Sequence, residues 1–186
     1  MNKERLVAFT DAIVAIAATI MVLELGVPAM KNWQGFWEER VVFLAYIVSY
    51  MMIYLVWFMH HNLFQKAEII TTRTFLINGV WLFFLTLVPF VTAWIGKAPD
   101  ATPPAVLYTV DMLCWSACFQ WLDYQIRKDN PGTDRDSSTR LADRLIMYIG
   151  YALCLALAFV LPKMVLPVIG IISIIMIIRV MFAYKR

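Results

Sequence analysis

Long apolar stretches separated by short polar ones dominate this chain of 186 residues. A helix that crosses about 30 Å of hydrocarbon needs roughly 17 to 25 mainly apolar residues. Six stretches reach that length, and Gly, Pro and polar residues separate them. The predicted spans cover residues 5–25, 40–62, 73–96, 104–124, 142–161 and 164–182. We therefore predict an all-α polytopic membrane protein, with residues 1–186 forming a single six-helix transmembrane subunit.

The composition supports a lipid bilayer as the surroundings of this chain. Hydrophobic residues make up 62% and charged residues 16%, and the mean hydropathy is +0.71. A soluble domain has about half apolar and a quarter charged residues. A soluble enzyme, a secreted disulfide scaffold and a disordered chain are thus excluded, and a net charge of +3 is no indication of nucleic acid. Cys114, Cys118 and Cys154 all lie in apolar stretches, which is typical of packed thiols.

The basic residues predict the orientation. Of the 16 Lys and Arg residues, 12 fall on one side of the six predicted spans and 4 on the other. Cytoplasmic loops carry the excess of positive charge, so both termini are expected in the cytoplasm. An alternative is that residues 1–29 are a cleaved signal peptide. Asp11 and Glu24 interrupt that segment, so we expect the first helix to be retained.

The first predicted helix carries polar residues that a lipid-facing anchor does not need. Asp11 lies two turns after Arg5, Thr19 lies near the middle, and Glu24 lies near the outer end. An ionisable residue inside a membrane helix faces a bundle interior or water, and is a candidate functional residue. For Asp11 the alternative is an acid held by hydrogen bonds for packing. For Glu24 it is a solvated helix end.

Helical geometry separates two faces of this helix. At about 100° per residue, Ile16, Ile20 and Leu23 form one stripe, with Thr19 at its edge. Asp11 points in nearly the opposite direction. The stripe and the acid must therefore meet different partners.

Other polar residues are expected at the depth of Asp11. Trp57 and the pair His60 and His61 lie near the inner end of the second span, and Asn78 lies near the start of the third. A buried polar cluster of Asp11, Trp57, one histidine and Asn78 would satisfy its own donors and acceptors. The alternative for Trp57 is anchoring at the membrane interface.

These motifs together resemble a known family. Arg5, Phe9, Thr10 and Asp11 are similar to the R-x-x-x-F-S-D signature of the transmembrane protein 175 potassium channels of endolysosomes and prokaryotes. Threonine stands at position 10 where the family usually has serine. Further similarity is found in an Ala-Ile-x-x-T-x-x-x-L-E pattern, in Trp57-x-x-His60-His61-x-x-Phe64, in Asn78 and in Pro89-Phe90-x-Thr92.

The resemblance implies a potassium-permeable channel lined by the first helix. Ile16, Ile20 and Leu23 would form the constriction, and Thr19 would place a hydroxyl beside the path. Arg5, Phe9, Thr10, Asp11, Trp57, His60, His61 and Asn78 would form the signature and its helix-packing polar network. Single-repeat prokaryotic chains of the family form homotetramers in the cell membrane, with potassium as the permeant ion and no further cofactor.

Physical arguments agree with parts of this implication. One six-helix bundle fills its own interior, so an aliphatic stripe forms a pore only when copies face each other around an axis. The sequence has no T-V-G-Y-G filter, so selectivity for potassium over sodium would depend on the cost of dehydration and be modest. Glu24, repeated around the outer mouth, would attract cations.

Asp111 in the fourth predicted span remains open. It is either a proton or cation site, or an acid paired with a neighbouring Tyr, Thr or Lys. His60 and His61 point about 100° apart and cannot clamp one metal ion, so no metal site is expected. The alternative function is a proton- or cation-coupled secondary transporter that uses Asp11, Glu24 or Asp111 as a relay. A membrane enzyme has no motif to support it.

Overall fold

The computed structural model describes residues 2–132 and 141–183. All regular secondary structure in these residues is helical. The helices are α1 (Lys3–Leu23), α2 (Trp33–Glu38), α3 (Arg40–Lys66), α4 (Thr72–Lys97), α5 (Thr102–Asp129), α6 (Leu141–Val160), the 3-10 turn η2 (Pro162–Met164) and α7 (Val165–Ala183). The prediction of an all-α fold is therefore confirmed.

Local sequence signals explain where several helices begin. The Asn2 side chain accepts a hydrogen bond from the backbone N–H of Arg5 and caps α1. The Thr71 hydroxyl oxygen caps α4 in the same way. Such caps satisfy backbone donors that the first helical turn leaves free. Proline stands in the first turn of α5, where its missing N–H costs nothing.

Five of the six predicted spans coincide with helical segments that are long and apolar enough to cross a membrane. In the described residues these are α1, α3, α4, α6 and Pro162–Ala183. The remaining span, 104–124, lies in α5, which at 28 residues is the longest helix. α5 is too polar to meet the hydropathy criterion that the other five segments meet, because it contains Asp111, Gln120 and Asp123. The chain is thus a multi-pass membrane protein by its helices, and the number of six crossings stays a prediction.

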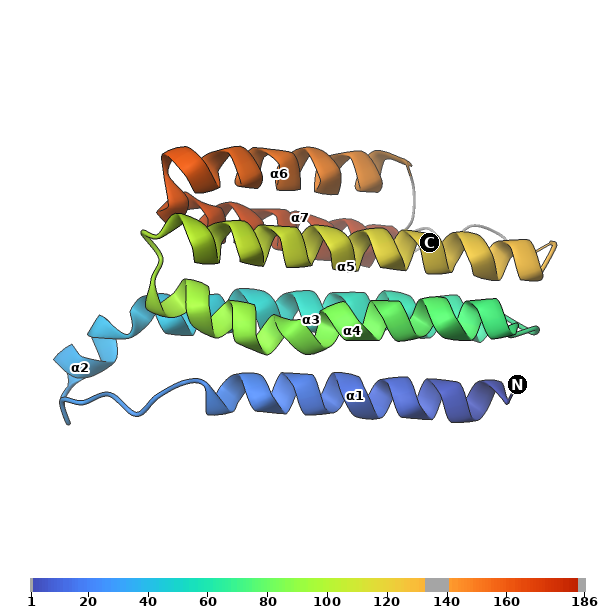
Figure 1. Ribbon diagram of the computed structural model, residues 1–186, viewed down its shortest axis with the longest axis horizontal. Coiled ribbons are helices and arrows are strands. Elements are labelled where there is room, and N and C mark those ends of the chain that lie inside the picture. The colour runs from blue at the N-terminus through green and yellow to red at the C-terminus, as the bar shows by residue number, and fades with distance from the viewer. Residues whose placement is uncertain (1, 133–140, 184–186) are drawn as a thin grey trace.

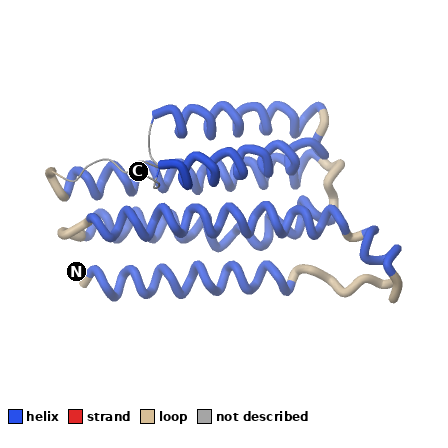
Figure 2. Tube along the Cα trace, turned by 180° about the vertical axis from the view of Figure 1, so that it is seen from behind, coloured by secondary structure: helices blue, strands red, loops and turns tan. Residues whose placement is uncertain are grey.

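The helices lie side by side along one direction (Figure 1). α1 occupies one edge of the bundle and packs against α3 and α4, which form the next layer. α5, α6 and α7 lie on the far side of that layer, and the view from behind shows the same order (Figure 2). α2 lies beyond one end of the bundle. α1 begins and α7 ends near the opposite end.

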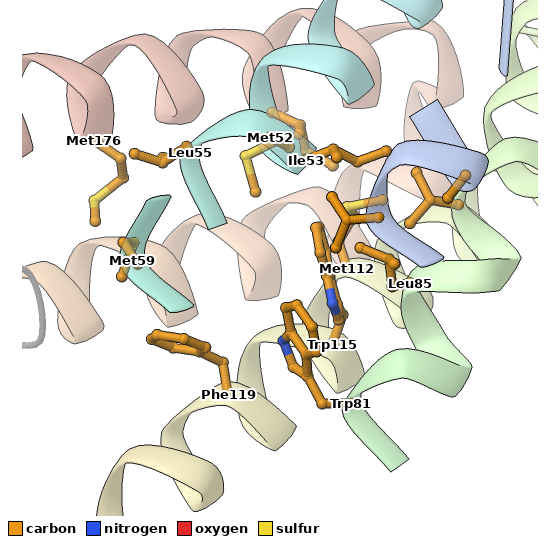
Figure 3. Packing of buried hydrophobic residues seen from close by; sticks show 14 of the residues in the cluster. Met52, Ile53, Leu55, Met59, Trp81, Leu85, Met112, Trp115, Phe119 and Met176 are labelled. Carbon is orange, nitrogen blue, oxygen red and sulfur yellow. The ribbon is translucent and has the colours of Figure 1, made fainter. Parts of the chain in front are cut away.

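The apolar core runs through the bundle and takes residues from all six long helices, most of them from α3, α4, α5 and α7 (Figure 3). Trp81 of α4 stacks on Trp115 of α5, with ring centroids 5.9 Å apart. Flexible thioether side chains fill the space around these rings: Met52, Met59, Met112 and Met176. This core fixes α3 and α4 as a platform, and α1 lies on the outer side of that platform.

Candidate functional site

α1 has one buried face and one uncovered face. Its buried residues recur at helical spacing and contact α3 and α4: Leu6, Thr10, Val14, Ala17 and Met21. On a second face, about 110° around the helix, Ile16 is 55% exposed, Ile20 43% and Leu23 79%. Helices of the same chain therefore leave the aliphatic stripe uncovered.

Polar groups lie at the edge and at the outer end of this stripe. The Thr19 hydroxyl donates to the backbone oxygen of Ile16 at 2.8 Å, so its hydrogen is satisfied within the helix and its oxygen can still accept. A carboxylate oxygen of Glu24 lies 3.7 Å from Nζ of Lys97 at the end of α4. Both side chains are about half exposed, so the ion pair is weak. Lys97 nevertheless offsets part of the negative charge expected at this end.

Thr10 and Asn78 connect α1 to α4 in the buried interior. The side-chain amide of Asn78 donates to the Thr10 hydroxyl oxygen at 2.9 Å. The Asn78 carbonyl oxygen can only accept, so the Nε2 of His60, 2.9 Å away, carries the hydrogen and donates it. The His60 ring lies between Phe64 and Trp81, with ring centroids at 4.4 and 4.6 Å. One link thus joins α1, α4 and α3.

Asp11 makes a separate contact with α3. Nε1–H of Trp57 donates to the Asp11 carboxylate at 2.9 Å. His61 lies beside the Trp57 ring, with centroids 5.8 Å apart, and its Nε2 is 2.8 Å from the side-chain nitrogen of Gln65. Adjacent positions on a helix point about 100° apart, which is why Thr10 reaches α4 while Asp11 reaches α3.

The structure therefore divides the expected polar cluster into two links. Sequence reasoning placed Asp11, Trp57, one histidine and Asn78 in one cluster and assigned Thr10 to the helix-packing network without naming its partner. In the structure Thr10, rather than Asp11, is the partner of Asn78. The position of Thr10 on the buried face, one turn before Val14, was a signal available in the sequence.

Arg5 and Phe9 lie on the uncovered face of α1. Both are exposed, and they line a shallow groove together with Asn2, Leu6 and Phe75. They extend the aliphatic stripe toward the beginning of the helix. The signature thus supplies two residues to the interior and two to the outside of the protomer.

A third polar group lies at the junction of α4 and α5 and was missed by sequence reasoning. Both Thr71 and Thr74 donate hydroxyl hydrogens to one oxygen of Asp129 at 2.7 Å, and the Gln125 amide donates to the other at 2.8 Å. Burial alone raises the pKa of Asp129, but these hydrogen bonds outweigh it and hold the pKa below its usual range. The N-cap pattern at Thr71 was the only local signal of this site.

Asp111 is buried in α5, and neither carboxylate oxygen has a hydrogen-bond partner among the described residues. The neighbouring Tyr108 hydroxyl is instead 2.9 Å from Ser49. No group of three His, Cys, Asp or Glu side chains suited to a metal ion occurs in the described part of the chain. His60 and His61 point to different partners, Asn78 and Gln65.

The chain is similar to proteins of one channel family. Residues 5–89 match the family model described as endosomal/lysosomal potassium channel TMEM175. A potassium channel of Chryseobacterium sp. strain P1-3 is 37% identical over 123 residues, which is 66% of this chain and 64% of that protein, so the match covers less than two thirds of that relative. A potassium channel of Streptomyces collinus is 26% identical over 93% of this chain and 91% of its own length.

A solved structure extends the similarity to the whole fold. It is the crystal structure of a lysosomal potassium-selective channel TMEM175 homolog from Chamaesiphon minutus, with a TM-score of 0.81 and 26% identity. The superposition covers 96% of this chain and 97% of that one. All three similar proteins are described as channels rather than enzymes. The family model, the two bacterial channels and the solved fold thus all relate this chain to the TMEM175 family.

Proposed function

We propose that this chain is the subunit of a homotetrameric, potassium-permeable cation channel. The observation that carries the proposal is the uncovered face of α1 at the edge of the bundle, where Ile16, Ile20 and Leu23 are exposed. The names of the bacterial relatives and of the solved homolog support potassium as the permeant ion. A bacterial cell membrane is the proposed location.

An exposed aliphatic face by itself also fits lipid, but its surroundings favour a pore. Arg5 extends the stripe at its inner end, and Glu24 lies next to it at its outer end. Charged groups are costly beside hydrocarbon and favourable at the mouths of a water-filled path. Four copies facing a common axis would bring these groups together at both mouths.

An aliphatic ring controls ions by its width and dryness. When the ring is narrow, a hydrated ion cannot pass and the constriction stays dry. A wider ring lets partly dehydrated ions through. Sodium holds its water more strongly than potassium, so such a ring favours potassium to a modest degree. Glu24 raises the local cation concentration, and Lys97 limits this effect.

The reversal potential of the purified protein tests this proposal. The protein is placed in a planar bilayer with potassium on one side and sodium on the other. We expect a macroscopic current whose reversal potential shifts toward the potassium equilibrium potential. A verified, membrane-inserted protein that gives no current but exchanges radioactive potassium slowly and with saturation would contradict the channel and support a coupled transporter.

A further inference from the structure

Three tyrosines form a ladder on the outer face of α3. Tyr46, Tyr50 and Tyr54 follow one another at intervals of four residues, and Tyr50 and Tyr54 are 44% and 61% exposed. In the described residues no group hydrogen-bonds to their hydroxyls. Tyr50 and Tyr54 lie close to the middle of Arg40–Lys66, a helix that is long and apolar enough to cross a membrane. A hydroxyl without a partner in hydrocarbon is costly. Another protein surface therefore suits this ladder better than lipid does.

α4 carries a second ladder with the same spacing. Thr86, Phe90 and Trp94 are all exposed and lie at intervals of four residues. The Thr86 hydroxyl donates its hydrogen to the backbone oxygen of Phe83 at 2.7 Å. Its oxygen keeps lone pairs that can accept a hydrogen bond from outside the chain.

The two ladders line different grooves of the protomer: Thr86 and Phe90 line one together with Ile16 and Ile20 of α1, whereas Tyr50 and Tyr54 line another that α7 completes. α1 lies across both helices, bonded to α3 through Asp11 and Trp57 and to α4 through Thr10 and Asn78. When the uncovered face of α1 surrounds an axis, each copy meets one neighbour at its α3 flank and the other at its α4 flank. Rotational symmetry then brings the α3 flank of one copy against the α4 flank of the next.

Contacts within the chain show which residues of the two antiparallel helices share a depth. Hydrogen bonds join His60 to Asn78 and Ser49 to Thr92, and Val42 approaches Gly96 closely. In each pair the two residue numbers add to between 138 and 141. Rotation about an axis normal to the membrane conserves depth, so the same rule applies between copies.

By this sum of residue numbers, each residue of the α3 ladder lies at the same depth as one residue of the α4 ladder. Tyr46 lies at the depth of Trp94, Tyr50 at that of Phe90, and Tyr54 at that of Thr86. We infer that neighbouring copies of this chain dock through these ladders, with the Tyr54 hydroxyl donating to the Thr86 oxygen of the next copy. The aromatic pairs at the other two rungs add favourable ring contacts. This inference rests on the proposed tetramer and specifies its interface.

Cross-linking of two engineered cysteines with a short bismaleimide reagent tests the docking in the full-length protein. Tyr54→Cys and Thr86→Cys are combined in a background where the three native cysteines, Cys114, Cys118 and Cys154, are replaced by alanine. After membranes are treated with this reagent, we expect bands up to the tetramer in denaturing electrophoresis. Each single substitution should give no cross-link, because position 54 of one copy meets position 86 of the next copy and does not meet position 54 of that copy. Tyr54→Cys with Leu76→Cys, about ten residues out of register, is the matched negative control.

The mass of the detergent-solubilised protein separates the two ways in which this test can fail. A tetramer without cross-links between positions 54 and 86 would overturn the ladder contact and leave the assembly intact. A protein that stays monomeric would overturn the tetramer and the inference with it. Dimers formed by Tyr54→Cys alone would also overturn the inference, since they require a two-fold contact.

Milder substitutions test the hydrogen bond without cysteine. Tyr54→Phe and Thr86→Val each remove one partner and keep the side-chain size. We expect each variant to lower the tetramer fraction at a fixed detergent concentration, and the double variant to lower it no further than either single change. Additive losses would show that the two groups do not meet.

Discussion

At the scale of single residues, Asn78 is the polar junction of the buried interior. Its side-chain NH2 group donates a hydrogen bond to Thr10 of α1, and its carbonyl oxygen accepts one from His60 of α3. Asn78→Leu keeps the approximate volume and leaves both partners buried without a hydrogen bond. We expect a loss of about 1–2 kcal/mol in the free energy of unfolding. Thermal unfolding in detergent measures it, with Leu76→Ala on the exposed face of the same helix as the control. Equal melting temperatures for the wild type and Asn78→Leu would contradict a stabilising junction.

Asp129 provides a pH dependence outside the apolar spans. Burial raises the pKa of Asp129, but the hydrogen bonds from Thr74, Thr71 and Gln125 lower it by more than burial raises it. The net shift is therefore downward. A lowered pKa in the folded state stabilises the protein above the unfolded-state value of about 3.9, and this contribution is lost as pH falls through the folded-state pKa. We expect the melting temperature to fall on acidification below about pH 4 for this reason.

Asp129→Asn should lower the melting temperature at neutral pH and remove this part of the acid sensitivity. The same change at Asp100, which is exposed and lies in the connection before α5, at the other end of that helix from Asp129, is the control. If Asp129→Asn left the acid sensitivity of the melting temperature unchanged, that sensitivity would come from other carboxylates.

At the scale of elements, α1 combines a packing face with an uncovered aliphatic face. Polar replacement on the uncovered face should widen and wet the constriction without disturbing the core. We expect Ile16→Ser to raise the resting potassium leak, measured as flux from loaded liposomes, by about tenfold, which corresponds to about 1.4 kcal/mol off the barrier. Ile171→Ser on α7 is the matched control, because Ile171 is 58% exposed and Ile16 is 55% exposed. Equal leaks in the two variants would show that the stripe faces lipid.

At the scale of the whole molecule, the course of the chain bears on its orientation. α1 begins and α7 ends near the same end of the bundle (Figure 1), which requires an even number of crossings. α5 supplies the sixth if it crosses with its neighbours, and it lies alongside α4 over its length. We expect reporter enzymes fused at either terminus to be active only in the cytoplasm. Opposite locations of the two fusions would show that one helix does not cross.

The sequence by itself determined the helices and the nature of the surroundings. A run of about 20 apolar residues is helical in lipid whatever it packs against, because each backbone group bonds within its own helix. The aliphatic stripe of α1 also follows from local spacing, since Ile16, Ile20 and Leu23 share a face in any regular helix. These features need no knowledge of a partner helix.

The tertiary structure decided which polar groups meet. Thr10 reaches Asn78, Glu24 reaches Lys97, and Asp129 reaches two threonines more than 50 residues away. These contacts depend on the rotation and depth of each helix, which the apolar core shared by the long helices sets by close packing. Sequence spacing fixes directions within one helix and leaves the relative rotation of two helices undetermined. That is the physical reason why the stripe was found from the sequence, while the partners of Thr10 and Asp129 required the fold.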